Sequence, residues 1–322
     1  HMKAAVYTRY GGPDVVTVRD VPEPTPGPGE IVVETRAAGV TTADWRLRAA
    51  AFPGLVMGIA GRVMFGITGP RNPVLGSDFA GVVAGTGAGV TAFRPGDRVF
   101  GFSDGGAHAE RLVMKADKAV ALLPDGMSFA EGAALPFGAL AALEFLDGFA
   151  ELKAGEHVLI VGASGGVGAY TVQIARALGA EVTAVASGAR AAMLTDLGAD
   201  HVIDYRARGT ADWGGPFDVI FDTIGVTNYA QMAAQLADGG RFAPLNFGLS
   251  DVGAGRAAKR AGHRVILQVN RDTKAGLERL VAMIAEGRLR PVIDSSFAFA
   301  DIRAAYSKVE TRSRAGAVIV TF

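Results

Sequence analysis

Short apolar runs with strand-like alternation, separated by glycine and proline, fill residues 3 to about 125. They lie at residues 3–7, 15–18, 30–35, 79–84, 97–102 and 119–122. Turn-forming sequences interrupt them, among them Pro26-Gly27-Pro28-Gly29 and Pro95-Gly96-Asp97. Closely spaced short strands with such turns are typical of a small β domain. We therefore expect a barrel-like β domain in the first part of the chain.

From about residue 135 the pattern changes to alanine-rich helical segments that alternate with short apolar runs. Strands are expected at residues 157–161, 181–186, 201–204, 218–222, 241–245 and 264–269. Six strands alternating with helices suit a doubly wound parallel sheet of the nucleotide-binding type. An amphipathic helix is expected at 273–286, and a last strand at 317–322 that returns to the first domain. The expected division is 1–125, 126–271 and 272–322.

The most informative segment follows the strand expected at 157–161. It reads Ala163-Ser164-Gly165-Gly166-Val167-Gly168 and runs into a helical pattern, so the order is strand, glycine turn, helix. Gly165 would let the backbone approach a pyrophosphate, and Gly168 would let helix and strand pack closely. The helix N-terminus offers N–H groups to the anion. The alternative is an ordinary tight turn, which the strand and helix around it disfavour.

The end of the second expected strand indicates which dinucleotide is bound. An NAD-binding unit usually places Asp or Glu there, whereas a 2′-phosphate needs small donors and a cation. This chain has Ser187 followed closely by Arg190. A carboxylate would repel the phosphate and this pair would bind it, so NADPH is favoured. Alternatively, Arg190 is only a solvated helix residue.

Composition narrows the class of protein. At 322 residues the size favours about two domains, and 32 basic against 32 acidic residues give no global field for nucleic acid or an anionic membrane. The absence of cysteine excludes disulfides, thiolate nucleophiles and cysteine-ligated zinc, and fits the cytoplasm. His1 before Met2 reads as a remnant of cloning rather than targeting sequence. The apolar stretch 49–67 contains Pro53 and Arg62, so a loop or short helices are expected there rather than a membrane span.

The sequence resembles the medium-chain dehydrogenase/reductase superfamily, specifically its zinc-free quinone oxidoreductase and enoyl reductase branch. The resemblance covers nearly the whole chain, including Gly39-Val40 to Asp44-Trp45, Val74 to Gly81, Pro95 to Val99, Gly106 to Glu110, Ala134 to Pro136, the glycine turn, and Leu197 to Tyr205. It implies an α/β fold with a GroES-like β-barrel catalytic domain and a Rossmann domain with a doubly wound parallel sheet. It also implies a cofactor in the cleft between them, and commonly a homodimer.

The resemblance also implies which residues bind the cofactor. Ala163 to Gly168, Ser187, Arg190 and Tyr205 would hold the adenosine phosphates. The ribose and nicotinamide would be lined by residues that follow the fourth, fifth and sixth strands: Thr223, Ile224, Asn246, Phe247, Gly248, Val269 and Asn270. Such positions lie beyond the carboxyl ends of parallel strands, where ligands bind. Tyr205 could equally be a packed surface tyrosine.

The chain departs from the family pattern where the chemistry takes place. Zinc-dependent members carry cysteine and Gly-His-Glu ligands, whereas this chain reads Gly76-Ser77-Asp78, and its five histidines are scattered. No metal is therefore expected. Many quinone reductase relatives have an asparagine in place of Thr41 and a threonine in place of Ala141.

Without zinc, simple alcohol oxidation lacks its main electrophile, whereas an enone, enoyl thioester or quinone spreads the incoming charge onto its own oxygen. We therefore expect hydride transfer from NADPH to the β-carbon of an activated C=C bond and protonation at the α-carbon. Quinone reduction is the runner-up, and a non-catalytic NADPH-binding protein is an alternative from another class.

Three residues are candidates for the catalytic site: Asp44, Trp45 and His108. Asp44 either orients a backbone group or water beside the nicotinamide, or caps the helix expected at 45–50. His108 suits proton transfer, although a histidine in a β segment is more often structural. An apolar substrate wall is a further hypothesis, with core or dimer packing as its alternative, for Phe52, Met57, Met64 and Phe65.

Overall fold

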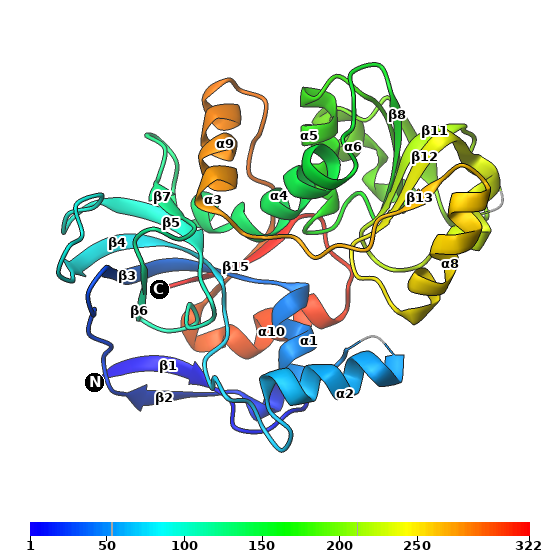
Figure 1. Ribbon diagram of the computed structural model, residues 1–322. Coiled ribbons are helices and arrows are strands. Elements are labelled where there is room, and N and C mark those ends of the chain that lie inside the picture. Colours follow the sequence, from blue (N-terminus) through cyan, green and yellow to red (C-terminus); the bar gives the residue numbers. More distant parts are fainter. Residues whose placement is uncertain (53, 211) are drawn as a thin grey trace. The chain divides into compact units, whose positions relative to one another are not determined.

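The computed structural model describes residues 1–322 except Pro53 and Ala211, and it does not describe the side chains of residues 54–57. The chain forms two compact units (Figure 1). Unit 1 consists of His1–Phe137, Asp272–Ala285 and Arg290–Phe322, and unit 2 of Gly138–Arg271 and Glu286–Leu289. The α/β fold class, with a mixed β unit and a parallel-sheet unit, is confirmed.

Unit 1 is built on a seven-stranded sheet. Its order is β14 (Ile293–Ala298), β15 (Ala317–Thr321), β3 (Glu30–Val40), β4 (Asp78–Thr86), β5 (Arg98–Phe102) and β7 (Val120–Leu122), while β6 (Arg111–Lys115) also pairs with β3. A separate hairpin joins β1 (Met2–Val6) and β2 (Thr17–Val21). The C-terminal strand β15 pairs antiparallel with β3, with Val318 opposite Val40. The last strand of the chain therefore belongs to the same sheet as β3, which lies near the beginning of the chain.

Helices cover and connect this sheet. They are α1 (Thr42–Ala49), α2 (Gly54–Phe65), α3 (Phe129–Ala133), α9 (Lys274–Ala285) and α10 (Ile302–Glu310). One apolar core lies around Phe79 and Val99, and a second lies under α10, where Tyr306 and Val309 pack against Val318 and Val320. These cores fix α1 and α10 beside the ends of β3 and β15.

Unit 2 holds a six-stranded, fully parallel sheet in the order β10 (His201–Asp204), β9 (Glu181–Ala186), β8 (His157–Val161), β11 (Phe217–Asp222), β12 (Leu236–Pro244) and β13 (Arg264–Val265). Numbered within the unit this is 3-2-1-4-5-6, the doubly wound order, which reverses between β8 and β11. Residues Val158–Val161 of β8 are all buried, as a strand covered on both faces requires.

The helices of unit 2 connect these strands. They are α4 (Pro136–Leu143, begun in unit 1), α5 (Gly168–Ala177), α6 (Ala191–Leu197), α7 (Tyr229–Met232) and α8 (Leu249–Arg260), with a π-helical turn at Glu144–Phe149. The first eight residues of α5, Gly168 to Ala175, are all buried. Small residues on α5 allow it to lie directly on the sheet.

The structure differs from the expectations at three places. The first unit continues past residue 125 to Phe137, because α3 packs on β3, β4 and β5. The strand expected at 264–269 ends at Val265, since the neighbouring β12 ends in Pro244, which has no N–H for the ladder. The segment 49–67 contains one longer helix, α2. No helix among the described residues is long and apolar enough to cross a membrane.

In unit 2 an ion pair joins the residue before β8 to strand β12. Arg241 on β12 donates from Nη1 and Nη2 to the two carboxylate oxygens of Glu156, at 2.9 Å each. These bonds lower the pKa of Glu156 below its usual value. A lowered folded pKa means that the stabilisation is present above the unfolded pKa, about 4.3, and is lost as the pH falls.

We predict that Glu156→Gln lowers the free energy of unfolding by about 1–3 kcal/mol at pH 7, because it replaces two charge-assisted hydrogen bonds by weaker ones. The deficit should shrink as the pH falls below about 4, where the wild-type carboxylate is protonated too. Urea unfolding of both proteins between pH 3 and pH 8 measures it. A deficit that is the same at every pH would contradict this account.

Candidate functional site

The glycine turn of unit 2 is shaped by two close backbone approaches. Gly162 has φ +79°, and a Cβ there would lie 2.6 Å from Thr223 Oγ1. A Cβ at Gly168 would lie 2.1 Å from the Gly162 carbonyl oxygen. At Gly165 a Cβ would meet only the Gly162 oxygen, at 3.5 Å, so that side of the turn is open. The turn thus has the form of a phosphate cradle in front of the first N–H groups of α5.

The position that sets the turn is Gly162, one residue before the motif that the sequence pattern emphasised. Gly162 N–H and Ala163 N–H both donate to the Val185 carbonyl at 3.1 Å, which ties the turn to β9. Only glycine adopts its left-handed backbone without cost and leaves room for Thr223. The substitution of the usual first glycine by Ala163 therefore leaves the geometry intact.

The loop after β11 is fixed against the same turn. Asp222, buried at the end of β11, accepts hydrogen bonds from the N–H groups of Ile224, Gly225 and Thr227 at 2.8–3.0 Å. The Thr223 hydroxyl donates to the carbonyl of Val161 at 2.7 Å. Thr223 and Ile224 thus lie at the carboxyl edge of the sheet where its strand order reverses, which is where ligands bind in such sheets.

The end of β9 holds the residues expected to select the cofactor. Ser187 precedes the short turn Gly188–Arg190, and Tyr205, half exposed, follows β10. Arg206 donates from Nε to Tyr205 Oη at 3.3 Å, which adds a second cation to this edge. The sequence reasoning missed Asp204, whose carboxylate would lie 2.5 Å from a Cβ at Gly188. One carboxylate therefore does face this edge, although it comes from β10 rather than β9.

The remaining cofactor candidates follow β12 and β13. Gly248 begins α8, with its N–H donating to Asp251 Oδ2 at 2.8 Å, and Leu245 N–H donates to the Asp222 carbonyl at 3.0 Å. Asn246 and Phe247 lie between these two anchored points, while Val269 and Asn270 follow β13 along the chain. The loops after β11 and β12 are thus joined through Asp222.

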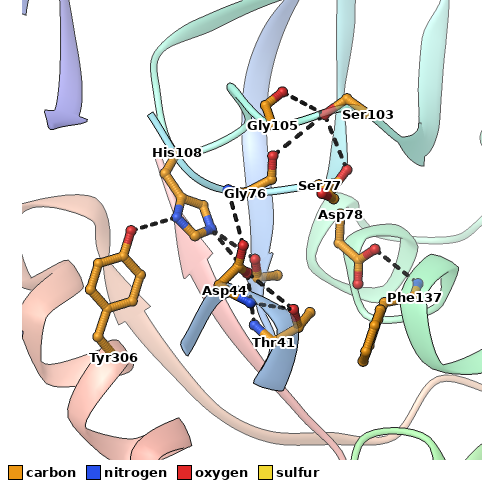
Figure 2. Close-up of polar contacts among 11 residues, drawn as sticks. Thr41, Asp44, Gly76, Ser77, Asp78, Ser103, Gly105, His108, Phe137 and Tyr306 are labelled. Carbon is orange, nitrogen blue, oxygen red and sulfur yellow. Dashed lines mark hydrogen bonds and ion pairs between the residues drawn. The ribbon is translucent and has the colours of Figure 1, made fainter. Parts of the chain in front are cut away.

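In unit 1, Asp44 is 3% exposed and closes a polar network (Figure 2). Its carboxylate accepts from Thr41 N–H at 2.9 Å, from the Thr41 hydroxyl at 3.2 Å and from Gly76 N–H at 3.1 Å. Thr41 is the N-cap of α1 and Asp44 its third residue, so together they form a capping box. Asp44 therefore does take part in capping α1, but the N-cap residue itself is Thr41.

His108 is fully buried, and both its ring nitrogens are engaged (Figure 2). Nε2 lies 2.9 Å from the Gly39 carbonyl oxygen, which can only accept, so Nε2 carries a proton. In the neutral ring Nδ1 then accepts from the Tyr306 hydroxyl at 2.7 Å. Burial and the charge of Asp44 raise the pKa of Tyr306, which keeps that proton in place. This geometry favours the structural alternative for His108.

Asp78, at the start of β4, is a second buried carboxyl group near this network. Its Oδ1 accepts from Phe137 N–H at 2.8 Å. Burial, followed by the charge of Asp44, raises its pKa well above the usual range. Two neighbouring carboxyl groups with unlike environments are a common arrangement in sites that move protons. The motif Gly76-Ser77-Asp78 signalled this position, but nothing in the sequence signalled Tyr306.

The other candidates of unit 1 lie apart from this network. Trp45 donates from Nε1 to Glu310 at 3.2 Å. Phe52 and Phe65 stack with ring centroids 5.9 Å apart, and Met64 is exposed, so the apolar segment is partly self-packed. The side chain of Met57 lies outside the described residues.

Among the residues that the structure describes, no three histidine, cysteine or acidic side chains are placed to hold a metal ion, so the side chains present do not fit a catalytic zinc.

Both units match families of known proteins. Residues 27–125 match the alcohol dehydrogenase GroES-like domain, and residues 197–320 match the zinc-binding dehydrogenase family. A 2-methylene-furan-3-one reductase of Solanum lycopersicum is 30% identical over 333 residues, covering 99% of this chain and 79% of that protein. The chain belongs to the medium-chain dehydrogenase/reductase superfamily. The expected resemblance is thereby confirmed.

Two further relatives locate the chain in the quinone oxidoreductase branch of that superfamily. An NADPH-dependent alkenal/one oxidoreductase of Arabidopsis thaliana is 29% identical, covering 99% of this chain and 79% of that protein. The quinone oxidoreductase from Coxiella burnetii superimposes with a TM-score of 0.88 at 26% identity, over 100% of this chain and 99% of that one. The chain is an oxidoreductase of this superfamily, and a nicotinamide dinucleotide is its cofactor.

We predict that Asp78→Asn flattens the pH dependence of stability. A raised folded pKa means that the wild-type chain loses stability as the pH rises above the unfolded value, about 3.9, towards the folded one. Because asparagine stays neutral, the variant should gain on the wild type between pH 4 and pH 8 in denaturant unfolding. Asp125→Asn, at an exposed position, is the matched control and should show no such gain. A constant difference between Asp78→Asn and the wild type would contradict the raised pKa.

A pair of glycine substitutions tests the cradle. Gly162→Ala should abolish measurable cofactor binding, because its Cβ would displace Thr223 and the turn. Gly155→Ala is the control, since Gly155 has φ +83° but nothing within 4 Å of a Cβ. The control should cost about 1–2 kcal/mol of stability from its backbone alone and retain binding. Equal cofactor affinity in the two variants, measured by calorimetry, would refute the proposed geometry.

Proposed function

We propose that this chain is a zinc-independent, NADPH-dependent reductase of activated C=C bonds, such as those of enones and enoyl thioesters. The observation that carries the proposal is the glycine turn at Gly162–Gly168, with Ser187 rather than a carboxylate at the end of the strand beside it. The relatives named alkenal/one oxidoreductase and 2-methylene-furan-3-one reductase support this substrate class. Quinone reduction is the alternative within the class, supported by the Coxiella burnetii neighbour.

The fit to NADPH depends on charge at one edge of unit 2. Arg190 and Arg206 bring two cations to the edge where Ser187 and Tyr205 offer hydroxyl groups. Asp204 opposes them, because its carboxylate lies against Gly188 and favours a ribose 2′-hydroxyl over a 2′-phosphate. Two guanidinium groups against one carboxylate leave a net positive edge, so we assign NADPH.

When bound, NADPH supplies a hydride to the β-carbon of the acceptor. The chain itself has to hold the acceptor in line, donate hydrogen bonds to the developing enolate oxygen and exclude water. In unit 1 the segment from Thr41 to Trp45 is held rigidly by the capping box and by Gly76. We assign Asp44 and His108 to positioning this segment, and we assign no direct contact to Trp45.

Turnover assays separate the candidate functions. NADPH oxidation should be fastest with an enone or enoyl thioester, slower with a quinone and absent with a simple aldehyde. Faster NADPH oxidation with a quinone would support the alternative function, quinone reduction. Tight NADPH binding with no NADPH oxidation in the presence of any acceptor would mean a non-catalytic NADPH-binding protein. A homodimer and a cytoplasmic location stay predictions, the first open to sedimentation analysis.

We predict opposite effects for two substitutions at the cofactor-selecting edge. Arg190→Ala should lower the ratio of kcat/KM for NADPH to that for NADH by about 10- to 100-fold, the range expected for one charge-assisted contact. Asp204→Asn should raise the same ratio, because it removes the opposing charge. Arg256→Ala, on α8 away from this edge, is the control. An unchanged ratio in Arg190→Ala would remove the 2′-phosphate assignment while leaving a dinucleotide site in place.

A further inference from the structure

One side of α2 in unit 1 presents apolar side chains to water. A surface helix normally turns its apolar residues towards the core and its polar residues outwards. Within residues 58–67, by contrast, every exposed residue except Arg62 is apolar. The largest exposed fractions form what we call the α2 face: Ile59 at 58%, Val63 at 55%, Met64 at 65% and Ile67 at 66%. Scattered single apolar residues are ordinary on a surface, but a run of them along one helix marks a surface that a partner covers.

Another side of the same helix is used for packing inside unit 1. A Cβ at Gly61 would lie 2.5 Å from the Phe52 ring, so glycine lets this ring lie directly against the helix. Phe52 in turn stacks on Phe65, with ring centroids 5.9 Å apart. The residues of the expected apolar wall therefore divide into two groups. Phe52 and Phe65 pack on each other, whereas Met64 belongs to the α2 face and has no aromatic neighbour in this stack.

Two arginines border the α2 face and fix the end of the helix. Arg62 donates from Nη1 to the Ile67 carbonyl at 3.2 Å, and its guanidinium carbon lies 5.1 Å from the centre of the Tyr10 ring. Arg71, in the loop after α2, donates from Nη2 to the Val63 carbonyl at 3.0 Å. Both guanidinium groups thus lie at the carboxyl end of α2, where the last carbonyls have no partner within the helix. The α2 face is therefore held in place by its own cationic border.

This border is positive although the formal net charge of the whole chain is zero. Residues 45–77 contain arginines but no aspartate or glutamate. Arg62 and Arg71 are both exposed, and within the described part of the chain neither pairs with a carboxylate. Burial raises the pKa of Tyr10, and the charges of Arg62 and Arg71 oppose that rise, which places both cations near its hydroxyl. The partner of the α2 face is therefore expected to carry negative charge beside an apolar region.

A lipid surface has this combination of properties. The four side chains of the α2 face offer no hydrogen-bond donor or acceptor, whereas contacts between proteins usually include about one hydrogen bond per 100–200 Å². An apolar helix face lies well at the boundary between headgroups and acyl chains, and cations at its border contact anionic headgroups. At 12 residues α2 is about 18 Å long, too short to cross a hydrocarbon core of about 30 Å. It would therefore lie in the plane of the surface.

We propose that the α2 face inserts into the surface of an anionic phospholipid membrane, with Arg62 and Arg71 against the headgroups. The contact is peripheral and reversible, since a single short helix buries little apolar area. It requires neither the cofactor nor the proposed reductase activity. It would bring the chain to the phase in which enones and quinones with hydrocarbon tails dissolve.

Flotation of the intact chain with lipid vesicles tests the proposal. The wild type should bind vesicles of phosphatidylcholine and phosphatidylglycerol in equal parts about 10-fold more tightly than vesicles of phosphatidylcholine alone. High salt should remove most of this difference, because it screens exposed charges. The double variant V63N/M64Q should bind both kinds of vesicle about 10-fold more weakly, because it removes apolar area from the α2 face. L122Q is the control, since Leu122 on β7 is 55% exposed in the same unit and should change binding less than twofold.

The two arginines are tested separately from the apolar side chains. R62Q/R71Q should weaken binding to the mixed vesicles about 10-fold and leave binding to phosphatidylcholine unchanged. R62K/R71K keeps the charge while losing the guanidinium geometry, so it should bind the mixed vesicles nearly as the wild type does. R94Q removes an exposed charge elsewhere in unit 1 and should have less than a twofold effect. Equal loss in the lysine and glutamine variants would mean that the arginines only hold the helix, and would contradict their role at the headgroups.

Insertion itself is measured with lipids brominated on their acyl chains, which quench tryptophan. M64W should be quenched on the mixed vesicles, whereas L122W and the wild type should not. Absence of vesicle binding by the wild type would overturn the proposal, and so would equal binding by V63N/M64Q.

Two other occupants of the α2 face would also overturn it. A dimer that sedimentation detects and V63N/M64Q abolishes, without vesicle binding, would assign the face to a second copy of the chain. A KM raised in V63N/M64Q only for acceptors with long hydrocarbon tails, again without vesicle binding, would assign it to the substrate. Inactivity of the wild type towards every acceptor would defeat the proposed function and leave the vesicle measurements valid.

Discussion

The structure of unit 2 depends on one close approach, where the end of β8 meets the first turn of α5. Gly168 lies so near Gly162 that no side chain fits between them, and Gly162 takes a backbone conformation that also leaves room for Thr223. This contact sets the N-terminus of α5 at the carboxyl edge of the sheet, where the strand order reverses between β8 and β11. Asp222 then fixes the next loop against the same edge through three backbone N–H groups. The geometry of the proposed anion site follows from this close packing together with the hydrogen bonds of Asp222.

Unit 1 is organised by buried polar groups. Asp44 accepts three hydrogen bonds from protein donors, and Asp78 nearby accepts one from Phe137 N–H. His108 joins β3 to α10 through Gly39 and Tyr306. Buried polar networks in which every member is satisfied rigidify their surroundings. This network therefore fixes the position of α1, the helix that carries Asp44 and Trp45.

Much of the fold was predictable because its signals are local. Three strands of unit 2, at residues 157–161, 181–186 and 201–204, have the predicted bounds, since each is a short apolar run between turns. Other features depend on partners that the sequence does not reveal. The shortening of β13 follows from Pro244 on the neighbouring strand, and the pairing of His108 with Tyr306 joins residues 198 positions apart. Asp204 was missed for the same reason, because it reaches Gly188 across two adjacent strands.

The central claim is that the glycine turn and its positively charged neighbours bind NADPH in preference to NADH. Calorimetric titration of the intact chain with each dinucleotide tests it most directly. The account predicts saturable heat from both, with NADPH bound at least tenfold more tightly in low-salt buffer. Equal affinity would contradict the assignment of Ser187 and Arg190, and the absence of heat from either dinucleotide would contradict the cofactor site itself.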